Sequence, residues 1–263
     1  MLTVTRHREV LAVHAQSTFA RFGVGVYAYA LDGVLIDSGP NSLQQELAAF
    51  YSGIPVEKLL LTHAHEDHSG MASWLEKHKT ALIMIHPDLS ASTSKRGFIP
   101  MYRQFIWGAS RPFQSTPCPP VVDTGHYTLQ AIETPGHAPG HLAFFEKTNG
   151  WLFGGDLFIG ARQDGWMSQE SVPQHIQSLQ RVLSLDFDTL FSGHAGIVSD
   201  AKRVLSRKLA ELEELRSTVL DLVKTGLNPR QINRKLFPAG SPLTYFSQGD
   251  ISTYHLIRSI CEA

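Results

Sequence analysis

The chain has little of what marks a disulfide-bonded, secreted or membrane-embedded protein. Only two cysteines occur in 263 residues, Cys118 and Cys261, and they stand far apart without a CxxC pair. Neither a disulfide framework nor a thiolate metal site is therefore indicated. No apolar run is long enough for a membrane-spanning helix, and the first residues, MLTVTRHREV, have no apolar signal core. We therefore expect a cytoplasmic protein with no membrane partner.

Charge is also scarce and nearly balanced over the whole chain. Charged residues make up 18% of the sequence, hydrophobic residues 43%, and the net charge is −1, a composition typical of a globular protein. The balance is uneven, because residues 201–263 carry 10 basic against 6 acidic residues, a net charge of +4. This basic tail could contact the phosphate or carboxylate groups of an anionic substrate, or simply form a solvated helix face.

Short apolar runs separated by turn and helix signals indicate a mixed α/β fold. Segments 24–39 and 142–156 each read as a β-hairpin, turning at Asp32-Gly33 and at Asn149-Gly150. Further strand-like runs lie at 56–62, 81–86, 127–135 and 188–193, and helical patterns lie at 42–53 and 171–185. Strand blocks interleaved with helices predict a layered α/β architecture.

The pattern changes at residue 199. Segment 199–226 predicts a long amphipathic helix, Asn228-Pro229 opens a second helix, and Asp250 is a candidate start for a third. We therefore divide the chain into a main domain, residues 1–198, and a helical C-terminal extension, residues 199–263.

The densest group of candidate metal ligands is 62-THAHEDH-68, which follows an apolar run. Strand residues two apart point to the same side, so His63 and His65 can face one point in space. Asp67 and His68 are expected on the loop that leads into a helix at 69–78. Imidazole and carboxylate groups suit zinc, iron or manganese, and the absence of nearby thiolates argues against a closed structural zinc site.

Three more candidate ligands share this context. His137 in TPGHAPGH, Asp156 in FGGDLF and His194 in FSGHAG each follow an apolar, strand-like run and lie among glycines. A single Gly-flanked His or Asp is more often only a turn residue. Their repeated position at predicted strand ends, together with the first group, indicates one shared metal site.

In this order and at these intervals, the candidate ligands resemble the metal-binding pattern of the metallo-β-lactamase-fold hydrolases, over about residues 20–200. The resemblance implies an αββα sandwich for residues 1–198, with metal ions at one edge of the two sheets. It also implies two divalent cations, most simply Zn²⁺, with iron or manganese as alternatives. His63, His65 and His137 would bind the first ion, Asp67, His68 and His194 the second, and Asp156 would bridge them.

The resemblance also implies roles for residues around the ions. Asp37, in 35-LIDSG-39, matches a motif whose carboxylate hydrogen-bonds to the metal ligands and orients them without binding the metal itself. His141 is expected to form hydrogen bonds near the site. Two adjacent cations lower the pKa of a shared water, so that a bridging hydroxide exists near neutral pH, and they polarise the bond under attack. Asp67 would orient that water and pass a proton to the leaving group.

Within the superfamily the pattern is most similar to glyoxalase II (hydroxyacylglutathione hydrolase), while the helical tail resembles the β-lactamase-like protein 2 type. The bridging Asp156 departs from the true β-lactamases, so antibiotic hydrolysis is not expected. These similarities leave three functions open: hydrolysis of a small, anionic thioester, ester or lactone; phosphodiester cleavage in RNA or a nucleotide; and oxidation of a persulfide with a single iron. The first is favoured over a nucleic-acid substrate because the main domain is acidic and has no obvious platform for base stacking.

Overall fold

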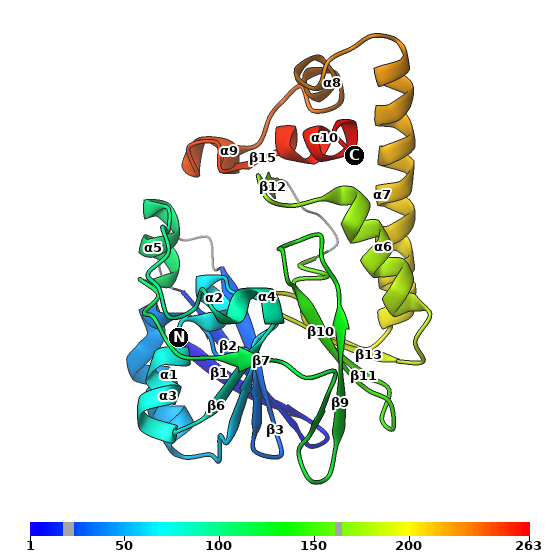
Figure 1. The fold of residues 1–263 in the computed structure, drawn as a ribbon. Helices are drawn as coiled ribbons and strands as arrows, with labels where there is room; N and C mark the ends of the chain where they lie inside the picture. The colour runs from blue at the N-terminus through cyan, green and yellow to red at the C-terminus, as the bar shows by residue number, and fades with distance from the viewer. Residues whose placement is uncertain (18–23, 161–164) are drawn as a thin grey trace.

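The computed structural model describes residues 1–17, 24–160 and 165–263. Its strands form two large sheets that pack face to face, with helices on both outer faces (Figure 1). This four-layer arrangement confirms the α/β class and the αββα sandwich implied by the resemblance. In the described ranges, no helix is both long and apolar enough to cross a membrane.

Within the described residues, the first sheet has seven strands in sequence order. They are β1 (Leu2–His7), β2 (Val10–Gln16), β3 (Gly25–Leu31), β4 (Val34–Ile36), β5 (Lys58–Leu60), β6 (Leu82–Ile85) and β7 (Thr116–Pro117). The predicted turn at Asp32-Gly33 is confirmed, with φ of 48° and 75°, the left-handed pair of a tight hairpin. Strands β4 to β7 pair in parallel, so their carboxyl ends lie at one edge of the sheet.

The second sheet has six strands in the part of the chain that the structure describes. Their order is β14 (Gly196–Val198), β13 (Thr189–Ser192), β11 (Trp151–Gly155), β10 (Leu142–Glu146), β9 (Thr128–Glu133) and β8 (Val121–Asp123). The hairpin of β10 and β11 is confirmed, but Glu146 pairs with Trp151, so residues 147–150 form a longer loop than Asn149-Gly150 alone. Strands β11 and β13 run parallel, and both end at the edge where the first sheet presents its carboxyl ends.

Helices cover the outer faces of both sheets. On the first sheet lie α1 (Gln44–Ser52) and α3 (Ala72–Lys79), and on the second lie α6 (Val172–Leu183) and α7 (Ala201–Lys224) (Figure 1). Shorter elements surround the site edge: η1 (Asn41–Leu43), α2 (Glu66–Ser69), α4 (Pro87–Ser90), α5 (Met101–Trp107), and the strand pair β12 (Trp166–Met167) and β15 (Ile251–Ser252).

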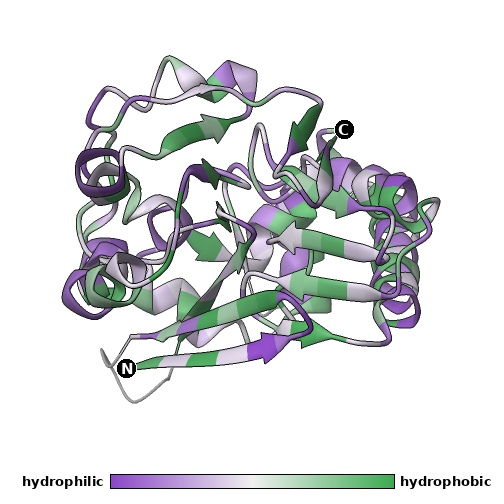
Figure 2. Ribbon diagram, turned by 90° about the horizontal axis from the view of Figure 1, so that it is seen from below, coloured by the Kyte–Doolittle hydropathy of each residue, from purple (hydrophilic) through white to green (hydrophobic). Residues whose placement is uncertain are grey.

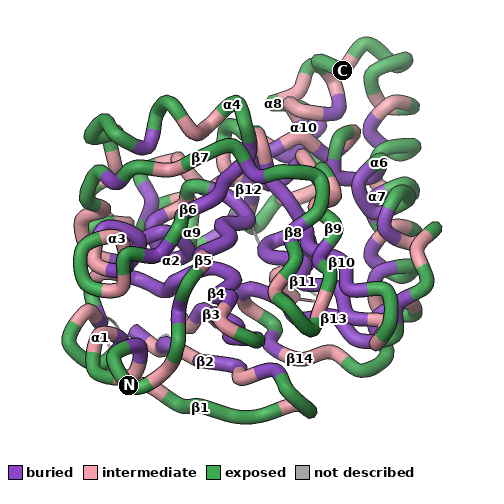
Figure 3. The backbone as a smooth tube through the Cα atoms, turned by 60° about the horizontal axis from the view of Figure 1, so that its bottom comes forward, coloured by how far each residue is buried: buried purple, intermediate pink, exposed green. Residues whose placement is uncertain are grey.

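The central strands are buried on both faces, which explains their nearly continuous apolar sequences. On β3, Val26 and Ala28 pack toward the helices, whereas Tyr29 and Leu31 pack toward the second sheet. Figure 2 shows the apolar colour along the strands, and Figure 3 shows the buried backbone running through the middle of the molecule. Burial on both faces fixes the register of each strand and therefore the position of its carboxyl end.

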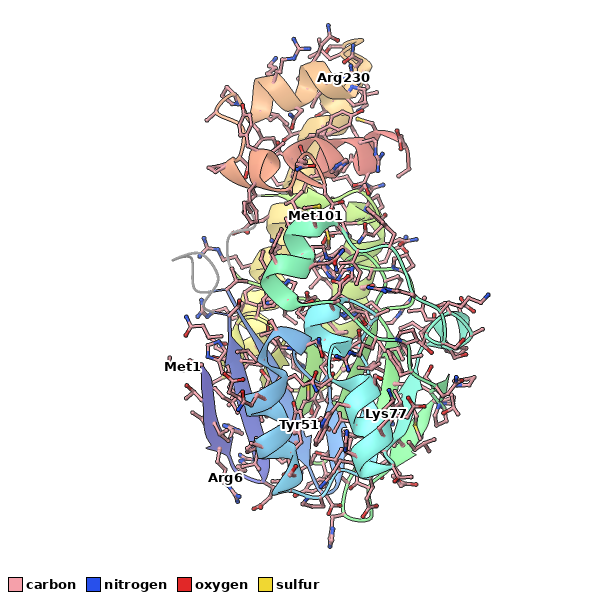
Figure 4. The ribbon with its side chains drawn as sticks, turned by 90° about the vertical axis from the view of Figure 1, so that its left-hand side faces the viewer. Met1, Arg6, Tyr51, Lys77, Met101 and Arg230 are labelled. Atoms are coloured by element: carbon pink, nitrogen blue, oxygen red, sulfur yellow. The ribbon has the colours of Figure 1, made fainter. Side chains whose placement is uncertain are left out.

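The C-terminal extension is helical, as predicted. Helix α8 (Pro229–Leu236) begins with a capping box between Asn228 and Gln231, followed by α9 (Pro242–Phe246) and α10 (Thr253–Cys261). The last helix begins at Thr253 with Ser252 as its cap, not at Asp250. In Figure 4, Arg230 marks the far end of the extension, and Met101 on α5 lies between the strands and the C-terminal helices.

The extension shares a hydrophobic core with the second sheet. Leu205 and Leu212 of α7 and Ile257 of α10 belong to the same buried cluster as Phe145 and Leu152 of the sheet. The division of the chain at residues 198 and 199 stays a prediction, but apolar contacts tie the two parts together.

Candidate metal centre

All seven predicted ligands lie close together at one edge of the two sheets. They follow β5, β9, β11 and β13, or lie on the short helix α2: His63, His65, Asp67, His68, His137, Asp156 and His194. The prediction that Asp67 and His68 lie on a loop is wrong, because both are on the single turn of helix α2. Four residues are too few to show helical periodicity in a sequence.

Three imidazoles form the first group of possible ligands. Nδ1 of His65 lies 2.9 Å from Nε2 of His63 and 3.0 Å from Nε2 of His137. One nitrogen from each ring lies within 4.8 Å of the others, so a single ion could contact all three. The rings of His63 and His137 are buried, and neutral imidazoles suit a divalent transition metal.

Asp67, His68 and His194 form the second group. Oδ2 of Asp67 lies 3.3 Å from Nε2 of His194 and 3.6 Å from Nε2 of His68. The ligand atoms of these three residues also lie within 4.8 Å of one another. The second group therefore offers two nitrogens and one oxygen to a cation.

The carboxylate of Asp156 lies between the two groups. Its Oδ2 is 3.3 Å from Nε2 of His137, in the first group, and 3.3 Å from Nε2 of His194, in the second. Its Oδ1 is 3.2 Å from Nε2 of His68. One carboxylate thus reaches imidazoles of both groups, as a bridging ligand requires.

Partners outside the centre fix the orientation of these imidazoles. His68 Nδ1 lies 2.8 Å from Asp37 Oδ2, and His194 Nδ1 donates to the carbonyl oxygen of Gly25 at 2.8 Å. His63 Nδ1 lies 3.0 Å from Thr62 Oγ1. A partner on one ring nitrogen fixes the tautomer and aims the other nitrogen at the centre.

Two further partners come from residues that the sequence pattern did not reveal. His137 Nδ1 lies 2.6 Å from Oε1 of Glu170, and His65 Nε2 lies 3.3 Å from the side-chain amide of Gln169. Neither residue follows a predicted strand or belongs to a recognisable motif. No signal in 166-WMSQES-171 pointed to this role.

His141 supports the centre without facing an ion. Its Nε2 accepts from the backbone N–H of Asp156 at 3.1 Å, and its Nδ1 lies 2.8 Å from Thr134 Oγ1. Burial lowers the pKa of His141 to about 3, and the neighbouring His137 adds to the effect, so the ring is neutral. Because both ring nitrogens are engaged, His141 positions the Asp156 backbone.

The charges of the centre fit a divalent cation. Burial disfavours protonation of His68, but Asp156 and Asp37 outweigh it and raise the pKa of His68 well above its usual value. Burial is likewise outweighed at His194, where Asp156 raises the pKa to about 10. The carboxylates therefore stabilise a positive charge beside them. Without a metal this charge is a protonated imidazole, and a bound cation would replace the imidazole protons and supply the charge instead.

Unsatisfied polar atoms give an independent test of the fit. His68 Nε2 and Asp156 Oδ1 are buried and lie 3.2 Å apart as an ion pair, but among the described residues neither atom makes a hydrogen bond. Buried polar atoms without a partner are rare because they cost free energy. The ligand atoms of His63, His68 and Asp156 lie within 4.8 Å of one another, so a metal ion held there would give these atoms a partner and the residues present fit it.

Gly193 leaves the room that these ligands need. A Cβ atom on Gly193 would lie 2.5 Å from Asp156 Oδ1 and 2.7 Å from Cε1 of His68. Any side chain at this position would displace both ligands, which gives the glycine of FSGHAG a steric reason.

A buried ion pair borders the centre. Arg103 of α5 donates to Oε2 of Glu66 at 2.5 Å, and both side chains are almost fully buried. Burial raises the pKa of Glu66, while Arg103 opposes that shift. Arg103 is therefore already bound to a carboxylate of the chain.

Comparisons with known proteins agree with this geometry. Residues 23–194 match the sequence pattern of the metallo-beta-lactamase superfamily. The chain belongs to this superfamily. Its members are metal-dependent hydrolases, and the His and Asp groups described above could hold divalent ions.

Three relatives and one solved structure illustrate the similarity. The chain is 22% identical to the probable metallo-hydrolase YqjP of Bacillus subtilis, covering 88% of this chain and 86% of that protein. It is 26% identical to a hydroxyacylglutathione hydrolase of Xanthomonas euvesicatoria, covering 81% and 80%. It is 25% identical to an atrochrysone carboxyl ACP thioesterase of Aspergillus fumigatus, covering 71% and 55%. The fold is similar to that of the metallo-beta-lactamase family protein TTHA1429 from Thermus thermophilus, with a TM-score of 0.70, 20% identity and coverage of 97% and 94%.

Proposed function

We propose that the protein is a hydrolase that uses two divalent cations, most simply Zn²⁺, to cleave a thioester, ester or lactone. One observation carries the proposal: the carboxylate of Asp156 lies within 3.3 Å of imidazole nitrogens in both ligand groups. A single-metal site needs no such bridge. When bound, two adjacent cations lower the pKa of a coordinated water and polarise a carbonyl group.

The residues of the chain divide into two sets around the ions. His63, His65 and His137 would hold one ion, and Asp67, His68 and His194 the other, with Asp156 between them. The partners behind the rings keep each nitrogen aimed at the centre, so little reorganisation is needed when the substrate arrives.

Asp67 is proposed to act on the proton of the attacking water. Burial disfavours its ionisation, but His68 and His194 outweigh burial and keep the pKa of Asp67 well below its usual value. The group is therefore a carboxylate at neutral pH, able to accept a hydrogen bond from the water and orient it. The same carboxylate can pass the proton to the leaving group.

A thioester is the preferred substrate class. Relatives of this chain are named hydroxyacylglutathione hydrolase and carboxyl ACP thioesterase, although their identity to it is only 26% and 25%. A thiol leaving group also needs less help from a proton donor than an alcohol, because its pKa is lower. One carboxylate such as Asp67 would then suffice as the acid.

The test combines metal analysis with a panel of substrates. Purified protein should contain two zinc ions per chain and should turn over lactoylglutathione or other acyl thioesters. One iron per chain with oxygen consumption on a persulfide would instead establish the dioxygenase alternative. Absence of turnover of every thioester, ester and lactone by the metal-loaded protein would contradict the proposal.

Phosphodiester cleavage remains a second candidate because of the basic C-terminal extension. Several basic residues there, however, are paired with carboxylates of the same helix or its cap: Arg203 with Asp200, Arg207 with Glu211, and Lys224 with Asp221. This pairing reduces the positive charge available to a nucleic acid. Cleavage of single-stranded RNA in the same panel, without thioester turnover, would decide for this candidate.

A further inference from the structure

We propose that the C-terminal extension positions two histidines of the metal centre, acting through residues 166–171, with Glu170 and Gln169 as the positioning residues. We name residues 166–171 the bridging segment. The inference rests on the proposed metal centre, and it assigns a role to the extension within it.

One end of the bridging segment is bound to the extension. Strand β12 pairs antiparallel with β15, so that Trp166 lies opposite Ser252 and Met167 opposite Ile251. Nη2 of Arg258, on α10, donates to the carbonyl oxygen of Ser168 at 2.6 Å. These contacts join the segment to residues more than 80 positions later in the chain.

A further bond fixes the segment where it enters helix α6. The backbone N–H of Val172 donates to Oγ of Ser259, also on α10, at 3.2 Å. The segment is thus bound to the extension on both sides of Glu170.

The other side of the bridging segment faces the metal centre. Oε1 of Glu170 lies 2.6 Å from Nδ1 of His137, and the amide of Gln169 lies 3.3 Å from Nε2 of His65. The backbone N–H of Ser171 donates to the carbonyl oxygen of Gly136, next to His137, at 2.7 Å. Two of the three histidines in the first ligand group therefore have their outer nitrogen against this segment.

The Glu170 carboxylate is itself held in place. It is buried, with 5% of the residue exposed, and its Oε2 accepts from the backbone N–H of Met167, on β12, at 3.2 Å. Its position therefore follows the position of β12, and β12 is held by β15. A carboxylate behind a metal-binding imidazole fixes the ring and makes it a better ligand. Figure 1 shows β12 and β15 together between the C-terminal helices and the sheets.

The test measures metal affinity in the full-length protein by competition with a chelator, and the absorption spectrum of the Co²⁺-loaded form. In Glu170→Gln we expect metal affinity about 10- to 100-fold weaker and a changed Co²⁺ spectrum, because the charge behind His137 is lost. Arg258→Met, which removes the hydrogen bond from α10 to Ser168, should change both readouts in the same direction by a smaller factor.

Matched controls separate positioning from general destabilisation. Glu146 is also buried, and it accepts from the backbone N–H groups of Thr148 and Asn149 in a hairpin loop. Glu146→Gln should leave metal affinity and spectrum unchanged, as should Arg234→Met on the exposed face of α8. If the Glu170→Gln variant fails to fold, the Gln169→Ala variant provides the same test for His65, because Gln169 is an exposed residue.

Two results would overturn the inference. The first is a folded Glu170→Gln or Gln169→Ala variant, together with Arg258→Met, that keeps the wild-type metal affinity and Co²⁺ spectrum. This result would show that the bridging segment does not position the ligands. An equal effect in Glu146→Gln would show that the loss is not specific to the segment. Failure of the wild-type protein to bind any divalent metal would be distinguishable, because it overturns the proposed function itself.

Discussion

Asp37 holds the ring of His68 through a contact of 2.8 Å between Oδ2 and Nδ1. The same carboxylate accepts from the backbone N–H of Thr62 at 2.9 Å, so it joins the loop after β5 to helix α2. Asp37 follows β4 directly and has a left-handed backbone, with φ of 56°. The position predicted for this residue from LIDSG thus corresponds to a contact with the outer nitrogen of a candidate metal ligand.

Replacing Asp37 by Asn should weaken metal binding by about 10- to 100-fold, because the charge that orients His68 is removed. Asn tolerates the left-handed backbone, so the fold should persist. Chelator competition measures the affinity, and circular dichroism checks the fold. Unchanged affinity in the folded variant would contradict the role of Asp37.

Asp67→Ala should abolish hydrolysis, with a loss of at least about 100-fold in kcat, because the water loses the group that orients it and accepts its proton. The fold should change little, since Asp67 lies on α2, which is a single helical turn. Turnover of an acyl thioester and the thermal midpoint of the metal-free protein are the two measurements. Retained turnover would refute the assigned role.

Gly193→Ala should reduce metal content and activity together, because the new Cβ would come within 2.5 Å of Asp156 Oδ1. Gly97→Ala is the control, since a Cβ there meets nothing within 4 Å. We expect the control to change the free energy of unfolding by no more than about 0.5 kcal/mol. Metal analysis after purification would reveal the difference, and equal metal content in both variants would argue against the steric explanation.

The metal-free protein should lose stability as the pH falls below 6.5. Burial lowers the pKa of His175 to about 3, with His137 adding to the effect, while an unfolded chain binds the proton near pH 6.5. Between these values the unfolded state holds more protons, so the free energy of unfolding decreases as pH decreases. His141 acts in the same direction.

In His175→Phe the slope of unfolding free energy against pH should fall by up to about 1.4 kcal/mol per pH unit between pH 6 and 5. Urea unfolding of chelator-treated protein at several pH values gives this slope. An identical slope in wild type and variant would show that His175 is not buried in its neutral form.

The positions of the candidate ligands could be predicted because strand ends follow from local pattern. Asp156 and His194 come after short apolar runs, and parallel strands such as β11 and β13 bring their carboxyl ends to one edge. Glu170 could not be predicted in this way. Its place depends on the pairing of β12 with β15, a contact between distant parts of the chain that leaves no periodic signal in six residues.

The N-terminal hairpin and helix α5 likewise could not be predicted from local sequence patterns. Four of the six residues of β1 are exposed, so the strand carries no alternating burial, and its pairing with β2 depends on a turn that includes Arg8 at φ of 50°. Helix α5 has one buried residue, Trp107, too few to give a helical stripe. Both elements depend on tertiary contacts more than on their own sequences.

The candidate ligands come from both halves of the molecule: His63, His65, Asp67 and His68 follow strand β5 of the first sheet, and His137, Asp156 and His194 follow strands of the second. Bound ions would therefore cross-link the two layers of the sandwich, much as a disulfide joins distant segments, in a protein whose cysteines are both free. Because such ions would bind the assembled sandwich more tightly than the unfolded chain, the melting temperature should rise with the concentration of free metal.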